Sequence, residues 1–223
     1  LLAMGYLKDA LINYVALLGW SPGGEREIYS LSELIDVFEI RGISKSPAIF
    51  DFAKLNYINS EYLRGMTPEA FHEIAAPYIR EAVKNPAIDT TLIAPLLQPR
   101  CERLTDIPEK VDFFDALPAY EIALYCHKKM KTDEAGSLAV LRELLPVIEG
   151  VSDWGFDAIH AALFAYIEEK GYKNGYVLWP LRTALSGKQT TPGGGVELCL
   201  ILGKEESLRR MKAGIAQLEA VSA

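Results

Sequence analysis

The sequence predicts an all-α protein, with short helices packed in successive sub-bundles. Apolar residues recur at the spacing of a helix along most of the chain, whereas the alternation typical of strands is almost absent. Helix-capping residues precede several of these apolar stripes, and glycines follow them. Half of the 223 residues are hydrophobic, which is enough for a sizeable core.

The amino-terminal part is expected to contain helices with clear start and stop signals. An apolar stripe from Leu7 to Leu18 predicts a helix that ends at Gly19. Ser30 and Glu33 have the spacing of a capping box, in which each side chain binds the backbone N–H of the other residue. The next helix should therefore begin directly after this serine.

A break is expected at Ser46-Pro47, because the residue before a proline avoids the helical region. Apolar anchors for the following segment are supplied by Phe50, Phe52 and Leu55. These residues are expected to anchor the segment that follows the break.

Prolines are frequent in the middle of the chain. Thr67, Pro68 and Glu69 combine a cap, a proline in the first turn and an acid near the positive end of the helix dipole. The following prolines are expected to divide this region into short helices; they lie at positions 77, 86, 95, 99, 108 and 118. Breaks near Thr67 and Thr132 predict three parts, residues 1–66, 67–131 and 132–223.

Candidate helix caps continue toward the carboxy terminus with Asp89, Thr132 and Ser152. A helix closed by Gly171 has one apolar face, made of Phe156, Ile159, Leu163, Tyr166 and Ile167. Two more are expected at Leu178–Leu185, which closes at Gly187, and at Ser207–Leu218.

The charge excludes one class of function. The chain has 23 basic and 30 acidic residues, a net charge of −7, and the acidic excess is spread evenly along it. Nonspecific nucleic-acid binding depends on the release of many counterions and is not expected. A specific site built from a few placed arginines remains compatible with this charge.

Cysteines and apolar runs indicate the compartment. Cys101, Cys126 and Cys199 are far apart and form no CxxC pair, which favours a reducing cytoplasm over a disulfide framework. No apolar run approaches the roughly 18 residues of a membrane span. Cys126 and His127 are adjacent and have no partner pair, so no metal site is expected.

The amino terminus and the glycine run near residue 193 raise further expectations. Leu1 replaces the usual Met and leads directly into an amphipathic segment, which indicates the tail of a longer protein. The glycine run after Thr191-Pro192 lacks the preceding strand and the following Lys-Ser/Thr pair of a phosphate loop. A turn between helices is the expected structure there, and no catalytic residue is predicted anywhere in the chain.

Two arginines are candidates for RNA recognition. Arg100 follows Gln98-Pro99, where a helix is interrupted and both backbone and side chain can meet a ligand. Arg182 is expected early in a helix whose start Pro180 makes rigid. An arginine in such a position can hydrogen-bond an unstacked base, but plain salt bridges are the simpler alternative for both.

Long stretches of the chain resemble bacterial glutamyl-tRNA synthetase. The stem-contact helical domain of that family is resembled by "GYLKDALINYVALLGWSPGGEREIYSLSELIDVFEI" and "SKSPAIFDFAKLNYINSEYLR". Its anticodon-binding region is resembled by "LLQPRCERLTDIPE" and "YVLWPLRTALSGKQTTPGGGVELCLILGKEESLRRM". Order and spacing agree over essentially the whole chain.

The resemblance implies a role in binding tRNA for glutamate, both inside its L shape and at its anticodon. Arg100 matches the family arginine that reads the third anticodon base, and Arg182, Thr191 and Pro192 match positions that line the other bases. Some relatives have a bulky apolar residue after Thr-Pro-Gly, so the backbone of Gly194 is expected to take its place.

The resemblance also implies that the nucleotide-binding catalytic domain is missing and that this chain alone is inactive. No cofactor is expected in the chain, whereas ATP and Mg²⁺ are implied for the full-length enzyme. Ser44-Lys45-Ser46 is similar to the ATP-binding lysine-serine loop, which in family order precedes residue 1. Lys45 is therefore assigned to a tRNA phosphate or to solvent, and Lys54 and Arg64 are further expected phosphate contacts.

The expected partners are tRNA-Glu and the missing catalytic domain, with no membrane, and the chain is expected to be a monomer. The main alternative is an acidic, all-helical protein-interaction scaffold without RNA binding, which the even acidity and the lack of a basic face favour. A third possibility, an enzyme in its own right, predicts ATP–pyrophosphate exchange by this chain alone.

Overall fold

The computed structural model describes residues 1–45 and 47–222, without the side chain of residue 222. Within them, α-helices and short 3₁₀ helices follow one another, and the only β structure is two isolated bridges, so the all-α prediction is confirmed. Ser46, part of the expected break and of the lysine-serine lookalike, lies outside the described residues. The α-helices are α1 (Lys8–Gly19), α2 (Leu31–Val37), α3 (Phe52–Arg64), α4 (Pro68–Ala82), α5 (Thr90–Leu97), α6 (Ile107–Val111), α7 (Glu134–Glu149), α8 (Phe156–Lys170), α9 (Asn174–Ser186), α10 (Gly195–Leu202) and α11 (Lys204–Ser222).

The chain forms two compact units. Unit 1 comprises Leu1–Ala82 and Thr90–Glu109, and unit 2 comprises Val83–Asp89 and Lys110–Ala223. The division into three parts at Thr67 and Thr132 stays a prediction. Among the described residues, no helix is both long enough and apolar enough to cross a membrane.

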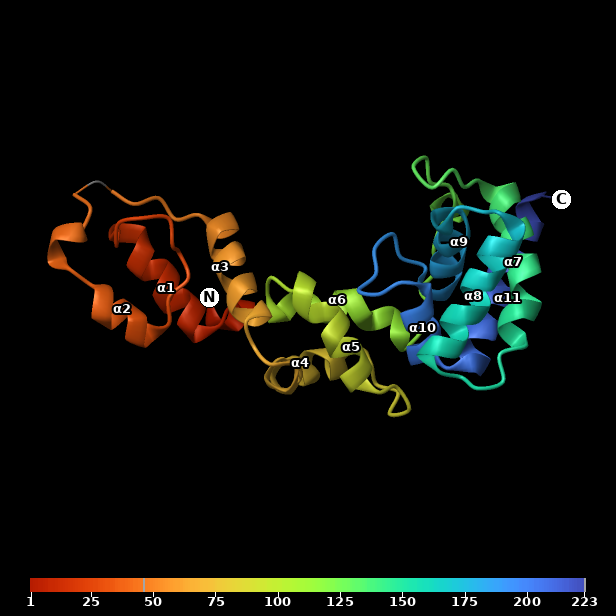
Figure 1. Ribbon diagram of the computed structural model, residues 1–223, viewed down its shortest axis with the longest axis horizontal. Helices are drawn as coiled ribbons and strands as arrows, with labels where there is room; N and C mark the ends of the chain where they lie inside the picture. The colour runs from red at the N-terminus through yellow and green to blue at the C-terminus, as the bar shows by residue number, and fades with distance from the viewer. Residues whose placement is uncertain (46, 223) are drawn as a thin grey trace. The chain divides into compact units, whose positions relative to one another are not determined.

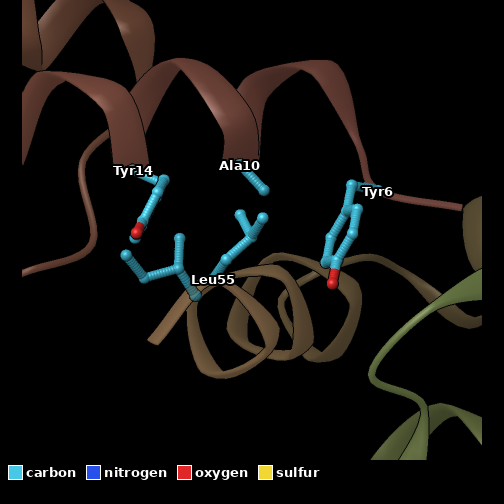
Figure 2. Packing of buried hydrophobic residues seen from close by; sticks show 5 residues of the cluster. Tyr6, Ala10, Tyr14 and Leu55 are labelled. Carbon is cyan, nitrogen blue, oxygen red and sulfur yellow. The ribbon is translucent and has the colours of Figure 1, made fainter. Parts of the chain in front are cut away.

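The amino-terminal half of unit 1 is organised by the packing of α1 on α3. Figure 2 shows Tyr6, Ala10 and Tyr14 facing Leu55 of α3, and all four are buried. The predicted end at Gly19 is confirmed, and Leu7, Leu11 and Leu18 of the predicted stripe pack against this cluster. Val15 was wrongly included in the stripe, because it is 59% exposed on the opposite side of α1 from the buried residues. The capping box is confirmed as well, because Ser30 and Glu33 bind each other's backbone N–H groups at the start of α2.

Asn59, on α3, ties three segments of unit 1 together. Its side-chain oxygen accepts a hydrogen bond from the backbone N–H of Leu7 at 2.8 Å, and its amide donates to the carbonyl of Glu102 at 2.5 Å. The side chain is fully buried, so both polar ends are satisfied inside the protein. The loop after Arg100 is thereby attached to the α1–α3 pair.

Unit 2 contains a helical bundle in which α7 packs against α8, α9 and α11, and α10 packs against α8, α9 and α11 (Figure 1). The predicted face of α8 is buried apart from Phe156, which is 42% exposed. Gly171 and Gly187 end α8 and α9 in the left-handed conformation, as expected from their positions.

A fully buried arginine joins three elements of unit 2. Arg210 of α11 donates to the carbonyls of Phe113 and Leu185 at 2.6 and 2.7 Å, and to the carboxylate of Glu206 at 2.6 Å. The carbonyl of Leu185 belongs to the last turn of α9, where helical carbonyls have no partner within the helix. Arg210 therefore fixes the carboxy-terminal end of α9.

The expectation that prolines divide the middle into short helices is wrong at two positions. Pro77 lies inside α4 and Pro95 lies inside α5. Both are exposed, so the carbonyl that loses its N–H partner four residues earlier can face water. Pro180 likewise lies inside α9, which begins six residues earlier, so Arg182 is in the second half of its helix rather than near its start.

Two of the expected caps are also displaced. Asp133 rather than Thr132 caps α7, accepting a hydrogen bond from the N–H of Gly136 at 2.7 Å. Thr132 is buried and its hydroxyl donates to the carbonyl of Tyr125 instead, because that carbonyl lies inside the protein. At α8 the cap is Gly155, not Ser152. The expected start at Thr67 is confirmed by its bond from the N–H of Ala70.

Candidate nucleic-acid interface

Helix α9 carries Arg182 on a face that is only partly covered. Its neighbours Leu181, Thr183 and Ala184 are buried, whereas Arg182 is half-buried. The helix is thus embedded in unit 2 around the arginine, and the guanidinium is held by a rigid element rather than by a mobile surface.

Three contacts fix the guanidinium of Arg182. Nη1 donates to the hydroxyl of Thr191 at 3.2 Å, and Nη2 donates to the carbonyl of Gln189 at 2.8 Å. The central carbon lies 4.5 Å from the centroid of Trp179, one turn earlier on the helix, in a cation–π contact. The planar group is therefore oriented before any ligand arrives.

The electrostatic environment of Arg182 is unusual for this acidic chain. Burial lowers the pKa of its guanidinium from the ordinary value, although an arginine still keeps its proton. No carboxylate pairs with it among the residues that the structure describes. Two of its five N–H groups serve Thr191 and Gln189, and a positive charge with further donors can thus meet an anion or a base edge.

The loop from Thr191 to Gly195 returns the chain to this arginine. The hydroxyl of Thr191 accepts from Arg182 and donates to the carbonyl of Gly193 at 2.6 Å. Gly195 is buried so closely against α9 that an added Cβ would lie 2.9 Å from the side chain of Leu181. A larger residue here would require Leu181 to shift, and the close contact holds the loop against α9.

The same loop is not a phosphate cradle. The N–H of Gly194, which precedes α10, donates to the carboxylate of Glu197 at 3.1 Å. A carboxylate of the chain itself occupies a place that a phosphate would need. The expected turn between helices is confirmed. Gly194 is exposed, and its nearest neighbour for an added Cβ is this same carboxylate.

Four of the five predicted anticodon residues thus lie on α9 and the loop that follows it: Arg182, Thr191, Pro192 and Gly194. Of these, Arg182 and Thr191 are in direct contact. Pro192 is half-buried beside them in sequence. The structure brings the group together, and its role in binding stays a prediction.

The fifth, Arg100, belongs to unit 1 and ends a 3₁₀ helix, Gln98–Arg100. Gln98 is buried, and its amide donates to the carbonyls of Leu63 and Met66 at 2.9 and 3.0 Å. Cys101, on the other side, is buried as well. Arg100 is exposed between these two anchors, so the interruption of the helix at this point is confirmed.

Lys45 follows a segment that is bound to the end of α1. The N–H of Ser21 donates to the carbonyl of Gly42 at 3.0 Å, and the N–H of Ser44 donates to the carbonyl of Gly19 at 2.9 Å. Lys45 itself is exposed. An exposed lysine on a fixed backbone suits a phosphate or solvent equally well, as the sequence led us to expect.

The other two predicted phosphate contacts are engaged within the protein. Lys54 forms an ion pair with Glu27 and lies over the ring of Tyr57, and Arg64 forms an ion pair with Glu61. A phosphate would have to compete with these carboxylates for Lys54 and Arg64. At Lys45 it would displace no such ion pair among the described residues.

Two aromatic residues of the site were missed from the sequence. Trp179 is almost buried, donates from Nε1 to the carbonyl of Leu124 at 2.9 Å, and lies 4.0 Å from the ring of His127. A cavity of about 480 Å³ opens beside both rings. Trp179 precedes Arg182 by three residues, the spacing of one helical face, and that signal was present in the sequence.

Comparison with protein families gives two matches. The model described as the anticodon binding domain matches residues 68–215. The model described as the catalytic domain of class I tRNA synthetases (E and Q) matches residues 2–57, within the part expected to be the stem-contact domain.

Curated relatives are glutamate–tRNA ligases. One from Clostridium botulinum is 50% identical over 221 residues, which are 99% of this chain and 45% of that protein. One from Clostridium tetani is 51% identical over 219 residues, which are 98% of this chain and 45% of that protein. The chain thus spans less than half the length of these relatives.

Two solved structures have the same fold over nearly the whole chain. A glutamate tRNA ligase from Elizabethkingia meningosepticum, in complex with its amino acid, aligns with a TM-score of 0.80 and 30% identity, over 96% of this chain and 42% of that one. The synthetase from Elizabethkingia anophelis aligns with a TM-score of 0.76 and 28% identity, over 95% of this chain and 41% of that one. Because the anticodon binding domain model covers well over half of its residues, the chain belongs to that family, in the form found in bacterial glutamate–tRNA ligases.

Proposed function

We propose that the chain binds tRNA-Glu and serves as the tRNA-recognition part of a glutamate–tRNA ligase. The observation that carries the proposal is the fixed guanidinium of Arg182, held by Thr191, Gln189 and Trp179 within a domain of the anticodon-binding family. Single-stranded bases are recognised by hydrogen bonds to their exposed edges and by stacking on planar side chains. Arg182 and its surroundings offer both.

Arg100 is proposed to read the third anticodon base. Cytosine offers two acceptors, O2 and N3, on its pairing edge, whereas guanine presents donors there. Arginine has only donors, so it favours the cytosine of glutamate anticodons over the guanine of glutamine anticodons. Its exposed position between the buried Gln98 and Cys101 supports this role.

We further propose that ligation of glutamate takes place elsewhere in a longer protein, with ATP and Mg²⁺ bound there. The glycine run of this chain is not suited to hold the phosphates of ATP, because the N–H of Gly194 is already bound to Glu197. The remainder of the class I catalytic domain is the proposed partner of residues 2–57. A cytoplasmic location is proposed on the three free cysteines, which suit a reducing compartment and of which Cys101 and Cys199 are buried. A monomer is proposed as well, on the resemblance alone.

A filter-binding titration with tRNA-Glu tests the proposal directly. Saturable binding that weakens as salt increases is expected, since phosphate contacts release counterions. The scaffold alternative predicts no saturable, salt-sensitive binding to tRNA-Glu or to bulk tRNA, and that result would remove the proposal.

Arg100→Gln separates affinity from specificity. We expect weaker binding of tRNA-Glu and a narrower gap to tRNA-Gln at fixed salt, because glutamine also offers an acceptor to guanine. Unchanged affinities for both tRNAs would end the assignment of Arg100 while leaving tRNA binding intact.

Arg182→Lys keeps the charge but loses the planar fork that reaches Thr191 and Gln189 and stacks on Trp179. Affinity for tRNA-Glu should fall by about tenfold, the lower end of the range for one stacked base. Arg142→Gln, at an exposed arginine paired with Glu219, is the matched control and should change affinity little.

A further inference from the structure

A short basic turn in unit 2 has no role in the proposed contacts. It consists of residues 127–132, and three of them, Lys128, Lys129 and Lys131, are exposed. Among the residues that the structure describes, none of these three lysines forms an ion pair with a carboxylate. Three unpaired cations within four residues are unexpected in a chain of net charge −7.

The backbone of the basic turn is fixed. The N–H of His127 donates to the carbonyl of Thr132 at 3.1 Å, and the reverse bond is 3.3 Å. Lys131 has a φ of 60°, the left-handed region that lysine seldom enters, and its N–H donates to the carbonyl of Lys128 at 3.3 Å. This conformation is maintained by the surrounding bonds, so the three lysines start from defined positions.

The basic turn is attached to the helix that carries Arg182. Met130 packs on Gly175 of α9 so closely that a side chain at that glycine would collide with its sulfur. The ring of His127 contacts that of Trp179 at a tilt of 50°, and the indole N–H of Trp179 donates to the carbonyl of Leu124, three residues before the turn. The basic turn and Arg182 are therefore attached to the same helix, α9.

A cavity lies beside His127 of the basic turn and Trp179 of α9. Its volume is about 480 Å³, and its walls include Tyr120, His127, Trp179 and Gln189. Gln189 is also the residue whose carbonyl binds Arg182. Three rings and an amide are the groups that stack on a base and hydrogen-bond its edge.

Nearby acids limit the range of the lysines' attraction. Glu121 lines the cavity, and Asp133 and Glu134 follow the turn, with the Asp133 carboxylate bound to the N–H of Gly136. The local charge is thus nearly balanced. The lysines must act through direct contact with phosphates rather than through a long-range field.

We propose that the basic turn and the adjoining cavity form a second RNA contact, distinct from the predicted anticodon residues. Lys128, Lys129 and Lys131 bind phosphates, while an unstacked base enters the cavity between Tyr120, His127 and Trp179. This inference rests on the proposed tRNA binding and adds to it a single-stranded segment next to the one at Arg182.

The phosphate contacts are tested with the variant Lys128→Gln, Lys129→Gln, Lys131→Asn, since asparagine tolerates the left-handed conformation. Filter binding of tRNA-Glu is measured over a series of salt concentrations. Each lost phosphate contact lowers the slope of log affinity against log salt by about 0.7, so the slope should fall by about 2. Affinity at about 0.1 M salt should drop roughly tenfold to a hundredfold.

The control variant is Lys8→Gln, Lys84→Gln, Lys212→Gln, which removes the same charge from three exposed lysines outside the basic turn. It should leave the slope nearly unchanged. Equal slopes for the two variants would refute the phosphate contacts while leaving tRNA binding in place. If the unaltered chain binds no tRNA-Glu, the proposed function fails and this inference fails with it.

The cavity is tested separately with Ala123→Phe, at an exposed position on its rim. Filling the cavity should weaken tRNA-Glu binding severalfold without altering the salt slope, because no charge is involved. The fluorescence of Trp179, in a chain with Trp20 and Trp154 replaced by Phe, should be quenched by tRNA and should lose this quenching in Ala123→Phe. Unchanged quenching and affinity would exclude base binding in the cavity.

Discussion

Residues 1–57 and unit 2 bury their apolar side chains to different extents. Of the 17 large hydrophobic residues that are exposed among those described, 14 lie in the first 57 residues and 2 in unit 2. Ile49 and Ile40 are 88% and 79% exposed. The 14 are Leu1, Leu2, Met4, Val15, Leu31, Ile35, Val37, Phe38, Ile40, Ile43, Ile49, Phe50, Phe52 and Tyr57.

This difference shows that the two regions cover their apolar side chains in different ways. Unit 2 covers its apolar surface with its own helices and even encloses the charged Arg210. The first region has a small core around Tyr14 and Leu55 and presents its remaining apolar side chains outward. Exposed apolar side chains in such number are typical of interaction surfaces, and the occupant proposed above is the rest of the catalytic domain whose model matches residues 2–57.

The largest effect should come from the interior of unit 2. Arg210→Ala leaves the carbonyls of Phe113 and Leu185 without their donor and Glu206 without its buried partner. The free energy of unfolding should fall by about 3 to 5 kcal/mol, as for other broken buried pairs, measured by urea denaturation.

Arg209→Ala is the control, because Arg209 pairs with the same carboxylate from an exposed position. Its cost should stay within about 1 kcal/mol. Equal losses of unfolding free energy in the two variants would show that the burial of Arg210 adds nothing to the stability of unit 2.

In unit 1 the largest effect should come from close backbone packing rather than from charge. A Cβ at Gly5 would lie 2.6 Å from the backbone nitrogen of Thr105 and 2.9 Å from that of Leu104. Gly5→Ala should cost roughly 2 to 3 kcal/mol of unfolding free energy, combining overpacking with a φ of 83°.

Gly23→Ala has a similar φ of 79° but open space around it, so only the backbone strain of about 1 to 2 kcal/mol applies. A loss as large as that of Gly5→Ala would mean that packing against Thr105 does not stabilise unit 1.

Acid should affect unit 2 through Glu206. Hydrogen bonds from Arg209 and Arg210 lower the pKa of its carboxyl from 4.5 to about 2. Because the folded-state pKa lies below the unfolded one, this stabilisation is complete above about pH 4.5 and is lost as the pH falls toward 2. Glu206→Gln should therefore flatten the dependence of unfolding free energy on pH in that window, whereas Glu205→Gln, at an exposed neighbour, should not.

The smallest effect on stability should come from the apolar surface itself. Ile40→Ser with Ile49→Ser should change the unfolding free energy of this chain by no more than about 0.5 kcal/mol, since both side chains are already in water. Binding of a hydrophobic dye should decrease. A large loss of stability would show instead that this surface is buried within the chain, and the comparison between the two regions would no longer hold.

The sequence predicted the helices best where local signals decide the structure. The box of Ser30 and Glu33 and the end at Gly187 depend on a few neighbouring residues, and both are confirmed. The predicted helix breaks at Pro77 and Pro95 were wrong because a proline on the solvent side of a helix can be tolerated. The prediction that Thr132 caps a helix was wrong because its hydroxyl donates to the carbonyl of Tyr125, seven residues earlier, instead.

For the candidate site, the sequence identified the loop but not its support. The proximity of Arg182 and Thr191 followed from the resemblance, and the structure shows their contact. The role of Arg210 in fixing α9 depends on segments 25 and 97 residues away, which no local pattern reveals. The ring contact of His127 with Trp179 also joins two segments that are far apart in the sequence.

The placement of the three tryptophans gives each unit an optical signal of its own. Trp20 belongs to unit 1, where its indole donates to the carbonyl of Glu39 at 3.0 Å, and Trp154 and Trp179 belong to unit 2, where they donate to Cys199 and Leu124. All three indole N–H groups are bound within their own unit. A chain with only Trp20 and a chain without it can therefore report by emission wavelength whether the two units unfold together or in separate steps.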